Sequence, residues 1–454
     1  MGSLQPSNSN ATVVAHVQVQ DEGCASDDDD PSLLRNVPNE VLSYIFILYS
    51  SSGSVRLPYS QTNVPCQILL SQVCAKWHQV ALSTSALWSN IGLFDAKIIR
   101  DYERCLSLYR TWIDRAGTHP LTVTIDLSNY DFNHQGLFQD FVLPFQFKRL
   151  NIRAMYKDLP RLSDIPISNV EEFGIFLDAV HRIENFAMLP FMNRTRSIRL
   201  RGRYSSDYGR GTLNALCSGL PWHELRSLEC RSFAVSLSAL LDILRQAQSL
   251  QTCHLTIHET GSGPLVGVSM PNLRHLSLGF KDVDPDIIIP LFATPNITAL
   301  DIYSYDRWSS DTYDILKKCH KLQQLQEFEL RPADFRLHIA QVLVDAPMVQ
   351  KLCIYSKPVV DAEALEGIAS GRLGCYLSSL HLGGYCDNIG EWLDMIEARQ
   401  RHVDAMVARV SSWRQMITGL KVVQFGYVTN SKAYKERLAA LKVLGTTVTL
   451  WELS

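Results

Sequence analysis

The sequence predicts an α/β protein, in which a small helical module at the N-terminus is followed by an irregular solenoid of parallel strands and helices. Three observations lead to this prediction. One short apolar motif recurs eleven times at nearly regular spacing, helix-like segments lie between its copies, and amphipathic helical segments precede the first copy. Such units stack side by side, because one strand–turn–helix unit cannot bury its apolar face alone.

The composition is that of an ordinary globular protein with enough apolar material for a sizeable core. Of the 454 residues, 46% are hydrophobic and 20% are charged, and the formal net charge is −3. That charge argues against a nucleic-acid-binding protein whose affinity depends on overall positive charge. The sequence has neither a long apolar run nor a signal-peptide pattern, so we expect no membrane span and an intracellular location, in the cytoplasm, the nucleus or both.

The first 31 residues differ from the rest, since they contain six acidic residues and neither Lys nor Arg. Low apolar content and a run of like charges predict a disordered, solvated tail over residues 1–31. A second interpretation stays open, in which Asp27 to Asp30 attract a basic partner or mark a kinase site around Ser26. The acidic residues are Asp21, Glu22, Asp27, Asp28, Asp29 and Asp30.

Helical periodicity begins after this tail. Pro38 can serve as a first helical residue, and Val41, Leu42, Ile45 and Phe46 then fall on one face of a helix. A second helix follows a Ser- and Pro-containing stretch, and a third, over 96–116, ends at Gly117 before an alternating strand pattern at 120–127. The predicted divisions are a disordered acidic tail at 1–31, a helical module at 32–92, a linker helix at 93–118 and a repeat solenoid at 119–454.

The recurring motif has the pattern apolar-x-x-apolar-x-apolar. Its copies start 23 to 30 residues apart, except for a last gap of 43 residues, and leucine-rich repeats have periods of about 20–29 residues. The Asn or Cys of the usual consensus is mostly absent, so we expect a degenerate, leucine-rich-repeat-like solenoid, with an irregular α/β domain as the alternative. The copies begin at Phe147, Val170, Thr195, Leu225, Leu250, Leu273, Ile297, Leu325, Val349, Leu377 and Leu420.

Segments between the copies predict the remaining elements. Helical spacing is present at 237–244 and 312–319, and the last long gap has room for a longer helix from about 390 to 417. The chain closes with a further strand candidate at 448–451. Each unit therefore consists of a strand, a turn and a helix.

Residues 33–91 resemble an F-box, because four of its motifs occur in the right order. These are Val37-Pro38-Asn39-Glu40, Leu42 with Ile45, Val73-Cys74-Ala75-Lys76-Trp77, and Leu87-Trp88. The layout as a whole, with a helix ending in Trp112 to Gly117 and a strand after it, is similar to the F-box proteins of mushroom-forming fungi. The segment from Ser50 to Pro65 is longer than the usual connection between the F-box helices, and an insertion in a loop costs little if it faces solvent.

The resemblance implies a substrate-recognition adaptor of a Skp1–cullin–F-box ubiquitin ligase. The F-box would bind a Skp1-like adaptor and, through it, cullin and RING subunits, while the repeat domain would hold an unknown protein target. An alternative is a non-catalytic repeat scaffold that uses its F-box for assembly without ubiquitination. Some of the apolar groups must be core, and Trp77 and Trp88 are the first candidates for that. The expected Skp1 contacts are Val37, Pro38, Leu42, Ile45, Val73, Trp77, Leu87 and Trp88.

Residues between the apolar strand positions point to the concave face of such a solenoid. Their mixture of Arg, Tyr and His suits a protein epitope, and the arginines can pair bidentately with an acidic or phosphorylated segment. For any single residue, a solvated strand face is the alternative. The expected target-binding residues are Arg199, Arg201, Arg231, His254, His275, Tyr303, Arg331 and Tyr355, and Glu229, Asp301, Glu329 and His381 belong to the same surface.

We find no motif for catalysis. The phosphate-binding glycine loop and the Gly-x-Ser-x-Gly elbow are absent, and His254 and His258 lie on a strand without a third metal ligand nearby in sequence. The prediction is therefore a protein that is not an enzyme, with no cofactor, metal or nucleic acid. An unrecognised enzyme would require a polar pocket that no motif indicates.

Overall fold

The computed structural model describes most of the chain from residue 37 onwards. The predicted disordered tail at 1–31 lies outside the described residues. The described ranges are 37–50, 55–57, 64–94, 102–127, 147–155, 170–178, 194–202, 222–231, 237–258, 264–309, 311–333, 336–355, 358–383, 388–409, 417–428 and 431–452.

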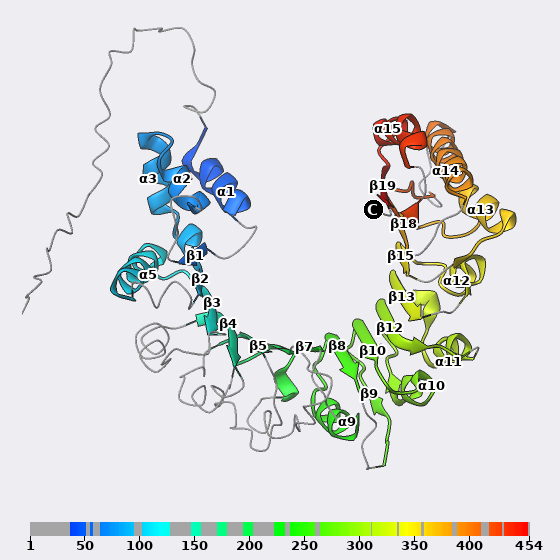
Figure 1. The fold of residues 1–454 in the computed structure, drawn as a ribbon, viewed down its shortest axis with the longest axis horizontal. Helices are drawn as coiled ribbons and strands as arrows, with labels where there is room; N and C mark the ends of the chain where they lie inside the picture. The colour runs from blue at the N-terminus through cyan, green and yellow to red at the C-terminus, as the bar shows by residue number, and fades with distance from the viewer. Residues whose placement is uncertain are drawn as a thin grey trace, which may run out of the picture.

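A single parallel sheet runs through the molecule as an arc (Figure 1). Fifteen strands of the described chain belong to it, and each pairs with the next one in sequence order. They are β1 (Val55–Leu57), β2 (Asn90–Phe94), β3 (Leu121–Leu127), β4 (Phe147–Met155), β5 (Glu172–Asp178), β6 (Ser197–Gly202), β7 (Ser227–Arg231), β8 (Thr252–Ile257), β10 (His275–Phe280), β12 (Ala299–Arg307), β13 (Glu327–Ala333), β15 (Lys351–Ile354), β17 (Ser379–Leu382), β18 (Val422–Val428) and β19 (Thr447–Glu452).

The described helices on the convex side of the arc lie near its N-terminal end and from residue 237 onwards, and the helices between residues 39 and 83 form its N-terminal tip (Figure 1). Two short strand pairs, β9 (Val268–Ser269) with β11 (Phe292–Ala293) and β14 (Leu337–His338) with β16 (Pro358–Val359), lie outside the main sheet. The helices are α1 (Asn39–Ser50), α2 (Cys66–Ser71), α3 (Ala75–Ser83), α5 (Tyr102–Ala116), α9 (Leu237–Gln246), α10 (Pro285–Ile288), α11 (Thr312–Cys319), α12 (Ile339–Asp345), α13 (Ala362–Ala369), α14 (Ile389–Arg409) and α15 (Lys435–Val443), with short 3-10 turns η2 (Ser85–Trp88), η4 (Trp222–Glu224), η5 (Ile289–Leu291), η6 (Leu322–Gln324) and η7 (Ser431–Tyr434).

The repeated motif forms the core because its apolar positions stack in register. Leu276 of β10 lies opposite Leu300 of β12, which lies opposite Phe328 of β13, and all three are at most 1% exposed. Ladders of this kind bury one face of the sheet. All eleven motif copies lead into a strand of the sheet, so the predicted α/β class with a large parallel sheet is confirmed.

The sheet starts earlier than the predicted boundary at residue 119. β1 and β2 pair with each other, and β2 pairs with β3, so both belong to the same sheet although we expected a loop and part of the helical module there. The helix expected as a linker, α5, connects two adjacent parallel strands. The sequence signal is weak because β1 has only three residues and β2 only five.

Trp88 joins the N-terminal helices to this sheet. Its ring is fully buried, its Nε1 donates to the Ala81 carbonyl at 2.9 Å, and its centroid lies 4.8 Å from that of Trp112 on α5. The Arg115 guanidinium lies 4.4 Å above the ring. One tryptophan therefore holds α3 and α5 together at the entry to β2.

His320, directly after α11, makes the stability of the fold depend on pH. Its side chain is 3% exposed, its Nδ1 lies 2.9 Å from the Thr294 hydroxyl oxygen, and burial lowers its pKa from 6.5 to about 4. Between pH 6.5 and about 4, the unfolded chain binds a proton at His320 and the folded chain does not. The stability that the protein has with a neutral His320 is therefore complete above pH 6.5 and is lost as the pH falls towards 4.

We expect His320→Gln to reduce this sensitivity to acid. Between pH 7 and pH 5, protonation of this histidine in the unfolded chain costs the wild-type protein about 2 kcal/mol of stability, and the variant escapes that cost. Urea unfolding of both proteins at the two pH values measures the difference. Equal losses of stability on acidification would contradict the assignment.

Candidate binding surfaces

The first candidate surface is the outer side of α1, a helix whose apolar residues extend well beyond its buried side. Its inner side carries Leu42 and Phe46, which are 1% and 0% exposed. The Phe46 ring packs 4.9 Å from the ring of Trp77 on α3. These contacts anchor α1 in the module, so its other apolar residues are not needed for its own core.

Five apolar side chains on the outer side of α1 are exposed to between 45% and 63%. They occur at helical spacing, which places them on one stripe. This outer stripe of α1 consists of Val41, Tyr44, Ile45, Leu48 and Tyr49. A surface helix of a globular protein normally has polar residues in these positions, so the stripe is an exposed apolar surface.

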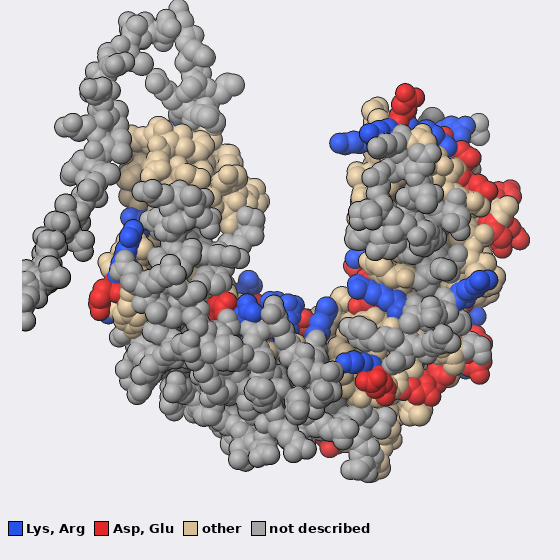
Figure 2. All heavy atoms as spheres, in the orientation of Figure 1, with Lys and Arg blue, Asp and Glu red and all other residues tan. Residues whose placement is uncertain are grey.

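The helices around α1 extend this apolar character. Leu69 of α2 is 48% exposed and Val73, just after α2, is 58% exposed. Glu40 and Lys76 are the only Asp, Glu, Lys or Arg residues in 37–50 and 64–89, and the Lys76 ammonium donates to the Val37 carbonyl at 2.7 Å. Figure 2 accordingly shows this end of the molecule as a largely tan surface.

The eight expected Skp1 contacts differ in their exposure to solvent. Pro38, Ile45 and Val73 are exposed, and Val37 and Trp77 are partly exposed. Leu42, Leu87 and Trp88 are at most 1% exposed, so these three residues belong to the core of the chain. The prediction missed Val41, Tyr44, Leu48, Tyr49 and Leu69, although the spacing of 41, 44, 45 and 48 already indicates a second apolar face.

The second candidate surface is the concave face of the sheet. The alternate strand positions that point away from the helices form rows across the strands, in register from β3 to β18. All eight expected target-binding residues either lie in these rows or stand two residues along the chain from a row residue. The sheet therefore brings them to one face. The central row reads Thr124, Asn151, Gly174, Arg199, Glu229, His254, Ser277, Asp301, Glu329, Cys353, His381 and Gln424.

Glu229 organises the arginines at the middle of the arc. Its carboxylate is 7% exposed and lies 2.7 Å from Arg201 Nη2, 3.3 Å from Arg231 Nε and 3.9 Å from Arg199 Nε. Arg231 Nη2 also lies 3.2 Å from His254 Nδ1. One buried carboxylate therefore holds three guanidinium groups on adjacent strands, in an arrangement that retains positive charge.

A hollow of about 390 Å³ lies beside this cluster, between β3 and β6. Arg153 borders it and is paired with Asp126 at 3.4 Å. The sequence-based prediction missed Arg153 and Asn151, because it drew on the motif copies from Arg199 onwards only. The described lining consists of Thr124, Asn151, Ile152, Arg153, Gly174, Ile175, Phe176, Arg199 and Arg201.

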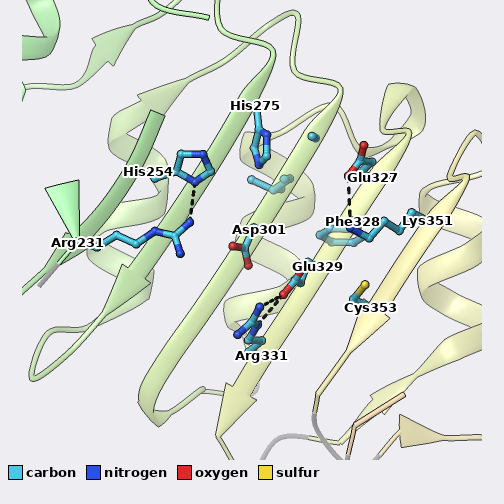
Figure 3. A pocket seen from close by; sticks show the side chains of 12 residues that line it. Arg231, His254, His275, Asp301, Glu327, Phe328, Glu329, Arg331, Lys351 and Cys353 are labelled. Atoms are coloured by element: carbon cyan, nitrogen blue, oxygen red, sulfur yellow. Dashed lines mark hydrogen bonds and ion pairs between the residues drawn. The ribbon is translucent and has the colours of Figure 1, made fainter. Parts of the chain in front are cut away.

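A second, smaller hollow of about 220 Å³ lies further along the concave face, from β7 to β15 (Figure 3). Asp301 accepts a hydrogen bond from the Ser277 hydroxyl at 2.7 Å, while its Oδ1 is buried without a hydrogen-bond partner in the described part of the chain. Burial raises the pKa of Asp301. Arg331 donates to Glu329, and its guanidinium lies 4.5 Å above the Tyr355 ring.

Two histidines form one wall of this smaller hollow. The His254 and His275 ring centroids are 4.7 Å apart, and burial together with the neighbouring His275 lowers the pKa of His254 to about 4. Burial also lowers the pKa of His275. Both rings are therefore neutral near pH 7 and offer one hydrogen-bond donor and one acceptor each.

The concave face can recognise charged and polar groups of another molecule. Within the described ranges, no group of three or more His, Cys, Asp or Glu side chains is placed to hold a metal ion. The same ranges contain no helix with the length and apolar character needed to cross a bilayer.

Comparison with models of known protein families finds no match, and comparison with curated protein sequences finds none either.

Proposed function

We propose that this chain is the substrate-recognition adaptor of a ubiquitin ligase of the Skp1–cullin–F-box type. In this proposal its N-terminal F-box-like helices bind a Skp1-like adaptor, which links the chain to cullin and RING subunits in the cytoplasm or the nucleus. The curved sheet acts as a leucine-rich-repeat-like solenoid, and its concave face holds the protein target. The chain itself performs no catalysis.

The observation that carries the proposal is the outer stripe of α1. Apolar side chains such as Tyr44 and Tyr49, 63% and 62% exposed, gain free energy when a partner removes them from water. An apolar stripe at i, i+3, i+4 and i+7 is the usual anchor pattern when a helix docks into an apolar groove of a partner. The resemblance of the motifs around this stripe to those of an F-box supports a Skp1-like protein as that partner.

The character of the concave face supports the second half of the proposal. Its charged residues come from many strands and lie open to a large partner. Each of the two hollows is also bordered by side chains from several strands. Interfaces of this kind bind protein surfaces through a few Arg and Tyr anchors with polar surroundings.

Co-expression of the full chain with a Skp1-type adaptor, a cullin and a RING protein tests the proposal. We expect all four proteins to elute together from a size-exclusion column. A folded chain that elutes alone would refute the adaptor function. A complex with the Skp1-type protein that excludes the cullin and the RING protein would instead favour assembly without ubiquitination.

A further inference from the structure

One glycine lets an amide side chain lie on the floor of the hollow between β3 and β6. Gly174 occupies the central row between Asn151 and Arg199, which lie opposite it on the neighbouring strands. A Cβ atom at this position would lie 2.3 Å from Asn151 Oδ1. The missing side chain therefore lets the Asn151 side chain lie directly over Gly174, so the Asn151 amide forms part of the floor of the hollow.

Arginines at the edge of this hollow carry more positive charge than the carboxylate beside them neutralises. Arg199 and Arg201 lie on the same face of β6, and Arg231 lies opposite Arg201 on β7. Among the ion pairs of the described chain, these three arginines share the one carboxylate of Glu229, so two positive charges remain in excess. Figure 2 shows Lys and Arg atoms gathered on the inner floor of the arc in this region.

Arg199 is the arginine best placed to bind a ligand. Its side chain is 52% exposed, and its ion pair with Glu229, at 3.9 Å, is the longest in the cluster. Its guanidinium can turn into the hollow without breaking a short ion pair. Arg201, whose contact with Glu229 is 2.7 Å, supplies a second guanidinium on the same strand.

We infer that this hollow binds a phosphorylated side chain of the protein target. A phosphoseryl or phosphothreonyl group carries about −1.5 to −2 charges at pH 7 and three acceptor oxygens, which matches two excess charges and two adjacent guanidinium groups. The carboxylate of an Asp or Glu side chain in the target would carry one negative charge and would neutralise only half of the excess positive charge. The inference rests on the proposed function, because it specifies the target that the adaptor recognises.

The rest of the concave face favours a protein segment over a nucleic acid. Asp301 and Glu329 lie on the same row as Arg199, four and five strands further along. Four strand spacings correspond to about 19 Å. A long nucleic-acid backbone following this face would place phosphates against those carboxylates, whereas a protein segment carries one phosphate and different side chains beyond it.

Binding of two peptide pools to the full-length chain tests the inference. Both pools contain dye-labelled decapeptides with randomised flanks, and they differ only in a central phosphoserine or serine. We expect the phosphoserine pool to bind at least tenfold more tightly in fluorescence anisotropy. Arg199→Gln should remove most of that preference, whereas Arg372→Gln should keep it. Arg372 is a matched control, 59% exposed and 3.8 Å from Glu363.

Three outcomes would overturn the inference. They are equal binding of the two pools, an unchanged preference in Arg199→Gln, and tighter Arg199-dependent binding of a single-stranded DNA 20-mer. Binding of a Skp1-type adaptor is measured on the same proteins. Adaptor binding without phosphopeptide preference refutes the inference alone, and phosphopeptide preference without adaptor binding refutes the proposed function.

Discussion

Replacing Ile45 with aspartate is expected to weaken binding of a Skp1-type adaptor at least 100-fold without unfolding the protein. Ile45 is 45% exposed at the centre of the outer stripe of α1, between Tyr44 and Leu48. In an apolar groove the new carboxylate loses its water without gaining a partner, and 100-fold corresponds to about 2.7 kcal/mol. Isothermal titration calorimetry with the purified adaptor measures the change, and the melting temperature reports on folding.

Val443→Asp is the control for this experiment. Val443 is also an exposed apolar residue of a helix, 89% exposed on α15 at the opposite end of the arc. We expect the same substitution there to leave adaptor binding unchanged. If Ile45→Asp binds as tightly as the wild-type protein, the outer stripe of α1 is not the adaptor surface.

Replacing Arg399 with methionine is expected to destabilise the C-terminal part of the arc by about 3–5 kcal/mol, because several buried acceptors each lose a donor at a cost of about 1–3 kcal/mol. Arg399 of α14 is fully buried, and burial lowers its pKa to about 10. Its shortest hydrogen bonds are 2.7 Å to the Ile368 carbonyl and 2.8 Å each to the Gly374 and Thr418 carbonyls. Methionine fills similar space but donates to none of these oxygens, so buried acceptors lose their charged donor.

Urea unfolding measures this effect, with Arg401→Met as the control. Arg401 lies two residues further along the same helix, is exposed, and makes one contact of 3.3 Å with the Glu397 carbonyl. Its replacement should change stability by less than about 0.5 kcal/mol. Equal stability of both variants would show that the Arg399 hydrogen bonds do not hold α13, α14 and the segment before β18 together.

The parallel sheet was predictable because its signal is local and repeated. Each copy of the motif contains the residues that its strand buries, as Leu273, Leu276 and Leu278 show for β10, all 0% exposed. The two strands at the N-terminal edge were not predictable in this way. β1 is too short to show a period, and it is a strand only because β2 lies beside it.

The candidate sites were predictable to different extents. Alternation along the strand is enough to predict that Arg199 and Arg201 share one face, and the register of the sheet confirms this placement. The hollow itself depends on Asn151, Gly174 and Arg199 lying opposite one another on three strands. All three occupy the fifth position of their motif copies, which begin at Phe147, Val170 and Thr195, so aligning the copies already indicates this register. The hollow above them is not visible in the sequence, because its shape depends on how the side chains pack.

By itself, the sequence determined the strands of the repeats and the face on which each of their side chains lies, because both follow from periodicity within a few residues. Only the tertiary structure decided which apolar side of α1 is buried, and which of Arg399 and Arg401 enters the core. It also placed Trp88 inside the protein. The physical reason is that burial depends on contacts between segments that are distant in sequence, such as Trp88 with Trp112 or Arg399 with Ile368.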